Sequence, residues 1–220
     1  MRSYLIPLYF MFIAMLAACE NPKSKESETT SSEVTAQQMD TLMEGDILFQ
    51  ISTSGQGKAI QLATNSPYSH CGILFRENNE WMVFEGVQPV KKTALNEWIK
   101  RGQHNIVVSK RLKNADQLLT PSVKNRMKTE ANKFIGKNYD LTFEWDDERI
   151  YCSELVYKIY KRGARIEVGK LQKLSEFDLS NPIVKAKLVE RYGTKIPLDE
   201  PVISPGAIFT DTNLVEILSQ

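Results

Sequence analysis

The chain has 220 residues, and its 28 lysines and arginines nearly balance its 27 aspartates and glutamates, giving a formal net charge of +1 at pH 7. Proteins that bind nucleic acid concentrate positive charge in a patch or stripe, and this sequence contains no dense basic stripe. It also contains no internal repeat and no glycine-rich phosphate loop. Nucleic acid is therefore excluded as an expected partner.

The amino terminus, residues 1–18, has the pattern of an export signal. Arg2 precedes an apolar run over residues 4–18, which is shorter than the roughly 20 residues that a membrane-spanning helix needs and fits the apolar part of a signal peptide. The run ends in Leu-Ala-Ala directly before Cys19. This ending resembles the bacterial lipobox, where cleavage before the cysteine is followed by acylation of its thiol. An ordinary secretory signal with an incidental cysteine is the alternative.

Residues 19–40 are rich in Ser, Thr, Glu, Lys and Gln and contain few large apolar side chains. Such a segment cannot bury enough surface to order itself, so we expect a flexible tether after the lipidated cysteine. Residues 41–220 remain as one domain of ordinary size. These features predict a lipoprotein anchored to a membrane of the bacterial cell envelope, on the exported side.

The predicted elements of the domain follow from hydrophobic periodicity and turn residues. Strands are expected over 45–50, 68–75, 81–87 and 105–111, and helices over 57–63, 95–100, 120–134, 152–162 and 180–193. Helices and antiparallel strands that are segregated along the chain favour an α+β fold.

Cys152 lies directly before the periodic apolar residues of the predicted 152–162 helix. The first turn of a helix presents unpaired N–H groups and the positive end of the dipole, both of which favour a thiolate. A thiolate nucleophile needs a base, and His70 is one of two histidines and lies in a predicted strand. Cys152 and His70 are therefore a candidate catalytic pair.

The hairpin formed by the second and third strands supplies a third candidate. A loop centred on Asn78 and Asn79 places Gly72 opposite Glu85 and His70 opposite Val87. His70 and Glu85 are then diagonal neighbours on one face of the sheet, where a carboxylate can orient an imidazole. The alternative is that Glu85 points to solvent from an edge strand.

The remaining cysteine, Cys71, follows His70 and should point to the opposite face as a small buried residue. A disulfide between Cys71 and Cys152 is the alternative for an exported protein. Two cysteines and two histidines without short paired spacings do not form a zinc motif, so no metal or other cofactor is expected.

Five motifs occur in an order that resembles one family: G-D-I-L-F at 45–49, S-H-C-G-I at 69–73, V-F-E-G at 83–86, G-x-x-Y-D at 136–140 and Y-C-S-E-L-V at 151–156. The sequence resembles the permuted papain-like amidases and peptidases, the YiiX and YaeF branch of the NlpC-like superfamily. This resemblance implies a papain-like core whose circular permutation places the histidine strand before the cysteine helix. It assigns Cys152 as nucleophile, His70 as base and Glu85 as the orienting group.

The expected function is therefore cleavage of amide bonds, in cell-wall peptides or lipid-linked amides, through a thioester on Cys152. Tyr139 is a candidate oxyanion donor or substrate wall, and a core aromatic is its structural alternative. Two other functions remain open. One is an acyltransferase that uses the same thioester, and the other is a non-catalytic lipoprotein that binds peptide or lipid.

Overall fold

The structure is a computed structural model that describes residues 36–219. The predicted signal peptide, Cys19 and most of the predicted tether lie outside the described residues. The last tether residues include a short helix, α1 (Ala36–Met39). Within residues 36–219, no helix has the length and apolar character required to cross a membrane.

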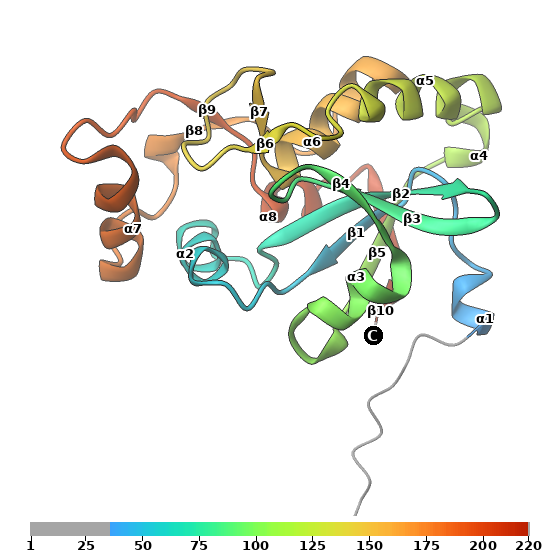
Figure 1. Cartoon of the computed structure of the whole chain (residues 1–220), viewed down its shortest axis with the longest axis horizontal. Helices are drawn as coiled ribbons and strands as arrows, with labels where there is room; N and C mark the ends of the chain where they lie inside the picture. The colour runs from blue at the N-terminus through green and yellow to red at the C-terminus, as the bar shows by residue number, and fades with distance from the viewer. Residues whose placement is uncertain (1–35, 220) are drawn as a thin grey trace, which may run out of the picture. The chain divides into compact units, whose positions relative to one another are not determined.

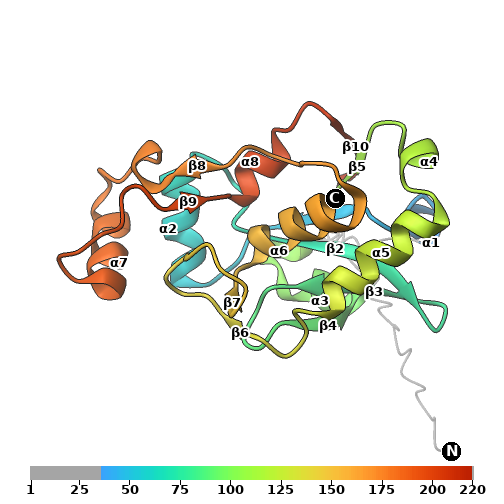
Figure 2. The ribbon, with the colours of Figure 1, turned by 90° about the horizontal axis from the view of Figure 1, so that it is seen from above.

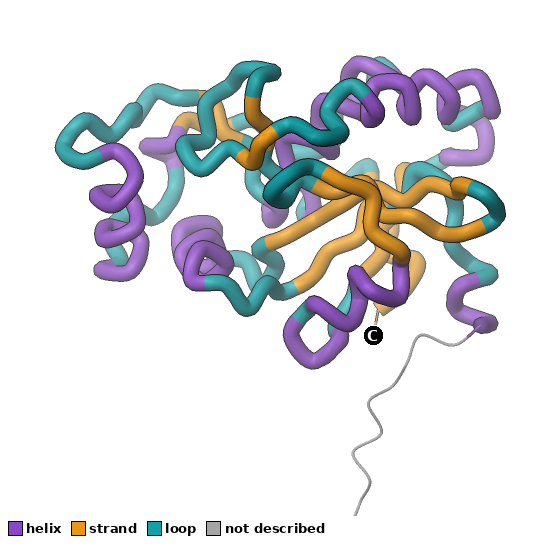
Figure 3. Tube along the Cα trace, viewed as in Figure 1, coloured by secondary structure: helices purple, strands orange, loops and turns teal. Residues whose placement is uncertain are grey.

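The centre of the fold is an antiparallel sheet of six strands in the order β10-β5-β1-β2-β3-β4. Figure 3 draws the strands in orange, with helices around them. Its strands are β1 (Ile47–Gln50), β2 (His70–Glu77), β3 (Glu80–Glu85), β4 (Lys91–Ala94), β5 (Val108–Leu112) and β10 (Leu214–Ser219). The sequence predicts the first three and β5, with ends shifted by a few residues. It does not predict the edge strands β4 and β10.

Helices surround this sheet, and α2, α3, α5, α6 and α7 lie at the five predicted helical segments, whereas α4 and α8 were not predicted. They are α2 (Gly55–Thr64), α3 (Leu95–Arg101), α4 (Ala115–Leu118), α5 (Pro121–Asn132), α6 (Cys152–Ile159), α7 (Pro182–Tyr192) and α8 (Pro205–Phe209). The shorter elements are η1 (Gln103–Asn105), β6 (Asn138–Tyr139), β7 (Arg149–Ile150), η2 (Tyr160–Ala164), β8 (Gln172–Lys173), η3 (Leu174–Glu176) and β9 (Pro201–Val202). The α+β prediction is confirmed, although the predicted 152–162 helix changes to a π-helical turn at Tyr160.

The two faces of the sheet bury different sets of side chains, because neighbouring residues of a strand point to opposite faces. Cys71, Ile73 and Phe75 of β2 lie in the larger core cluster, together with the apolar residues of α6. Leu74 of β2 packs on the other face with Trp98 of α3. Figure 1 shows α5 and α6 above the sheet and α3 below it.

The hairpin between β2 and β3 has the predicted register. Asn78 and Asn79 have φ values of 50° and 66°, as a two-residue type I′ turn requires at both positions. Gly72 then pairs with Glu85, as expected. The predicted pairing of His70 with Val87 is wrong, because β3 ends at Glu85.

One end of the sheet is covered by a group of elements from distant parts of the sequence. Figure 2 shows α2, α7, β8 and β9 gathered at this end, with the start of α6 facing them. The described part of the fold therefore brings α2, α6 and α7 together near the amino-terminal end of β2.

Candidate active site

The three predicted catalytic residues lie at the ends of three elements. Cys152 is the first residue of α6, His70 is the first residue of β2 and Glu85 is the last residue of β3. All three are largely or fully buried. The fold thus brings the helix that carries the thiol to the strand ends that carry the imidazole and the carboxylate.

The start of α6 is fixed by contacts on both sides of Cys152. The side chain of Glu154 accepts a hydrogen bond from the backbone N–H of Tyr151 at 3.4 Å, and the Tyr151 hydroxyl accepts one from the backbone N–H of Ile203 at 3.1 Å. Gly86 packs directly against this turn. A Cβ atom at Gly86 would lie 2.7 Å from the backbone nitrogen of Cys152, so a glycine is needed for this close approach.

The imidazole of His70 is held by Glu85. Its Nε2 atom lies 2.7 Å from Oε2 of Glu85, which leaves Nδ1 as the ring nitrogen for Cys152. Burial disfavours the charged imidazole, but hydrogen bonds with Cys152 and Glu85 outweigh burial and raise the pKa of His70 to about 9. His70 is therefore an imidazolium at neutral pH.

Glu85 is fully buried and accepts further hydrogen bonds from the opposite side. Thr93 donates to it at 2.6 Å and the Trp98 indole donates at 2.9 Å, while Arg101 forms a salt bridge with it. Burial favours the protonated carboxyl, but the bonds from His70, Arg101 and Thr93 outweigh it and lower the pKa of Glu85 to about 2. The alternative of a solvent-facing Glu85 is wrong.

Sequence reasoning missed the residues that bind Glu85. Arg101 and Lys100 have the pattern of a solvated basic pair, but the Arg101 guanidinium reaches the buried carboxylate. Trp98 and Arg101 are three residues apart on α3, so they share one helix face. That spacing was the available signal, but nothing in the sequence placed α3 beneath this end of the sheet.

The second free cysteine lies closer to the site than predicted. Cys71 is fully buried, as expected, yet its thiol and its backbone N–H both form hydrogen bonds with Cys152. The bond from Cys71, followed by the bond and charge of His70, outweighs burial and lowers the pKa of Cys152 well below its usual range. Burial raises the pKa of Cys71 well above its usual range. Cys152 is thus the thiolate and Cys71 the thiol.

Tyr139 lies beside the thiolate, on β6. Its hydroxyl oxygen accepts a hydrogen bond from Nε2 of Gln56 at 2.9 Å. Burial, together with the negative charge of Cys152, raises the pKa of Tyr139 well above its usual range. The hydroxyl therefore keeps its proton as a donor. Gln56 also lines the pocket, and the sequence analysis did not predict it.

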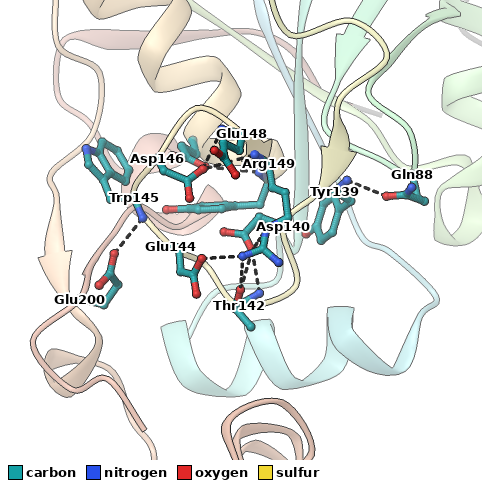
Figure 4. Close-up of polar contacts among 12 residues, drawn as sticks. Gln88, Tyr139, Asp140, Thr142, Glu144, Trp145, Asp146, Glu148, Arg149 and Glu200 are labelled. Carbon is teal, nitrogen blue, oxygen red and sulfur yellow. Dashed lines mark hydrogen bonds and ion pairs between the residues drawn. The ribbon is translucent and has the colours of Figure 1, made fainter.

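The loop after Tyr139 is held by its own polar contacts (Figure 4). Asp140 accepts hydrogen bonds from the backbone N–H and the hydroxyl of Thr142, at 2.8 and 2.9 Å. Arg149 binds Glu144 at 2.5 Å, and the backbone N–H of Trp145 donates to Glu200 at 2.8 Å. This network fixes the loop that carries one wall of the pocket.

An apolar cavity of about 90 Å³ opens beside Cys152. Its walls come from α2, the loop after β6, the start of α6, η3 and the residues that follow it, α7, and β9 with the residues that follow it. The apolar lining residues are Ala59, Ile60, Ala63, Phe143, Leu174, Phe177, Leu179, Val184, Leu188, Val202, Ile203 and Pro205. No feature of the sequence indicated this pocket, because its walls are brought together by the tertiary fold.

Comparison with known proteins identifies the class. The family model described as permuted papain-like amidase enzyme, YaeF/YiiX, C92 family, matches residues 41–218. An uncharacterized protein YiiX of Escherichia coli K12 is 47% identical over 176 residues, which cover 80% of this chain and 86% of that protein. The crystal structure of a protein described as metalloprotein YiiX, from Escherichia coli O157:H7, is 47% identical with a TM-score of 0.78, over 82% of this chain and 98% of that one.

The chain belongs to the permuted papain-like amidase family, as the resemblance predicted. It is a papain-like cysteine amidase or peptidase of the hydrolase class. The relative of known crystal structure is described as a metalloprotein. In residues 36–219 of this chain, no group of three or more His, Cys, Asp or Glu side chains is arranged to hold a metal ion.

Proposed function

We propose that this protein is a lipid-anchored thiol hydrolase of the cell envelope that cleaves amide bonds through Cys152, His70 and Glu85. The observation that carries the triad is the buried 2.7 Å contact between His70 and Glu85. It orients the imidazole and stabilises its charge, while the thiolate of Cys152 lies at the other ring nitrogen. This is the division of roles that a thiol, a base and an orienting acid have in acyl transfer.

The reaction begins with attack of the Cys152 sulfur on the amide carbon. The carbonyl oxygen gains negative charge, which the unpaired backbone N–H of Cys152 at the start of α6 can stabilise. Tyr139 is the proposed second donor, since its hydroxyl keeps a proton beside the thiolate. The same side chain also forms part of the pocket wall, so its two predicted roles are compatible.

His70 then gives its proton to the leaving nitrogen, the C–N bond breaks and a thioester remains on Cys152. Water attacks the thioester and transfers a proton to His70, which restores the imidazolium and the thiolate and releases a carboxylic acid. C–N cleavage consumes the proton on His70 and hydrolysis of the thioester returns one, while Glu85 stabilises the charged form of the imidazole.

The pocket favours a lipid-linked amide over a polar cell-wall peptide. Most of its lining residues are aliphatic or aromatic, and burial of an acyl chain there would contribute about 0.8 kcal/mol per CH₂ group. A polar peptide would leave its hydrogen-bonding groups without partners against such walls.

A matched amide panel tests this function. Wild-type protein should hydrolyse N-decanoyl amides faster than N-acetyl amides of the same amine, and Cys152→Ala should hydrolyse neither. Adding an amine acceptor distinguishes acyl transfer, because a new amide would then replace the acid as product. Binding of N-decanoyl amides without turnover by wild type would contradict the proposal and favour the non-catalytic alternative.

The proposed anchor is the lipidated Cys19, joined to the domain by the polar segment up to residue 40. Its support is the sequence pattern alone. Cys19→Ala removes the proposed site of acylation, and stable anchoring needs two or more acyl chains. The variant should therefore move from the membrane fraction to the soluble fraction. Complete retention of Cys19→Ala in the membrane fraction would refute the anchor and leave the hydrolase proposal intact.

A further inference from the structure

The substrate pocket carries a positive charge that the proposed chemistry does not use. In the described part of the chain, its lining contains two cationic side chains, Lys187 and Arg191, and no aspartate or glutamate. Both lie on α7, one helical turn apart. Lys187 is paired with Glu190 of the same helix at 2.5 Å, so much of its charge is already compensated.

Arg191 is in a different situation. Its guanidinium lies over the Phe143 ring, 5.2 Å from the ring centroid, and its side chain is half-buried. Among residues 36–219, it has neither an ion-pair partner nor a side-chain hydrogen bond. Five N–H donors are therefore left without a protein acceptor at a partly buried position.

The position of Arg191 links this charge to the reaction centre. The Tyr139 hydroxyl interacts electrostatically with both Arg191 and Cys152. Phe143, which lies under the guanidinium, also lines the pocket. A ligand that reaches Cys152 through the apolar pocket therefore passes near the guanidinium. The aliphatic walls lower the local dielectric and strengthen attraction to an anion.

We propose that Arg191 binds an anionic group of the substrate, a carboxylate or a phosphate, while the apolar walls of the pocket bind its acyl chain. The substrate is then an anionic N-acyl amphiphile. This assignment rests on the proposed hydrolase function, since it places the anion in the pocket of Cys152. The planar guanidinium matches carboxylate and phosphate in a bidentate manner, which a lysine cannot do.

Equilibrium binding to the Cys152→Ala protein tests the assignment without relying on turnover. Three ligands share one acyl chain and differ in their end group: N-decanoylglycine, N-decanoylglycinamide and N-decanoyl phosphoethanolamine. Calorimetry should show that at least one anion binds about tenfold more tightly than the neutral amide, as expected for a charge-assisted hydrogen bond. The tighter of the two anions identifies the group as carboxylate or phosphate.

Variants of Arg191 then locate the preference. In the Cys152→Ala protein, Arg191→Gln should abolish the preference for the anion and leave the affinity for the neutral amide nearly unchanged. Arg191→Lys in the same protein should keep part of the preference for the anion. Lys185→Gln is the matched control, because it removes one charge from the exposed face of α7 outside the pocket.

Equal affinities of the Cys152→Ala protein for the charged and neutral ligands would overturn the proposal. So would a preference that survives Arg191→Gln, or one that Lys185→Gln abolishes equally. Failure of the wild-type protein to hydrolyse any amide contradicts the hydrolase function separately, because the binding measurements do not require the nucleophile.

Discussion

Glu85→Gln isolates the role of the buried carboxylate in holding charge on His70. The amide keeps one oxygen for the donors His70, Trp98 and Arg101, and its NH₂ group can donate to the Thr93 hydroxyl in place of the bond that Thr93 now gives. The shape of the site is therefore retained, and the negative charge is lost.

The size of the effect follows from the two pKa values. Lowering the pKa of Glu85 from 4.5 to about 2 corresponds to about 3 kcal/mol in favour of the ionised form. Raising the pKa of His70 from 6.5 to about 9 corresponds to a similar energy, which Cys152 and Glu85 share. Loss of the Glu85 contribution should lower the pKa of His70 by about one pH unit.

The assay is an NMR titration of the ring protons of the two histidines, with His104 as the internal reference. Glu80→Gln is the control, because it makes the same substitution at an exposed position of β3. Activity of Glu85→Gln should fall partially, since the amide oxygen can still accept the ring N–H. A His70 titration identical to that of wild type, with full activity, would refute the orienting role of Glu85.

Three further predictions concern the nucleophile and its surroundings. Iodoacetamide should label Cys152 much faster than the fully buried Cys71, because Cys152 is the thiolate of the pair, and peptide mass spectrometry showing equal rates would count against Cys152. Gly86→Ala should destabilise the protein by about 1–3 kcal/mol and reduce activity by displacing the start of α6, measured by urea unfolding. Gly55→Ala, where an added Cβ meets nothing within 4 Å, should be nearly neutral in both respects, and an equal effect would contradict the packing argument. Activity should decline as the pH rises through about 9, because His70 then loses the proton that it gives to the leaving group; a profile that keeps rising through this range would exclude His70 as the acid.

Local signals in the sequence were sufficient for the parts of the site that depend on neighbours along the chain. The Asn78-Asn79 turn set the register that pairs Gly72 with Glu85, and the apolar periodicity after Cys152 placed the thiol at a helix start. The hydrogen-bonding partners of the site could not be predicted in this way. Trp98 and Arg101 reach Glu85 from α3, and α7 closes the pocket from a segment that begins 30 residues after Cys152.

The same limit applies to Cys71. Its alternation with His70 along β2 correctly predicted that it is buried in the core on the opposite face of the sheet. The thiol nevertheless touches Cys152, because α6 packs over that face and begins at the strand end, where both faces are within reach of the sulfur. The alternation of faces therefore predicts the direction of a side chain, but at the end of a strand it does not predict which neighbouring element contacts that side chain.

The central claim is that Cys152 forms a thioester with the acyl group of the substrate. Intact-protein mass spectrometry after rapid acid quench of a reaction with 4-nitrophenyl decanoate tests this directly. We expect one decanoyl adduct in wild type, mapped to the Cys152 peptide and released by neutral hydroxylamine, and no adduct in Cys152→Ala. The same adduct and turnover in Cys152→Ala would contradict the claim.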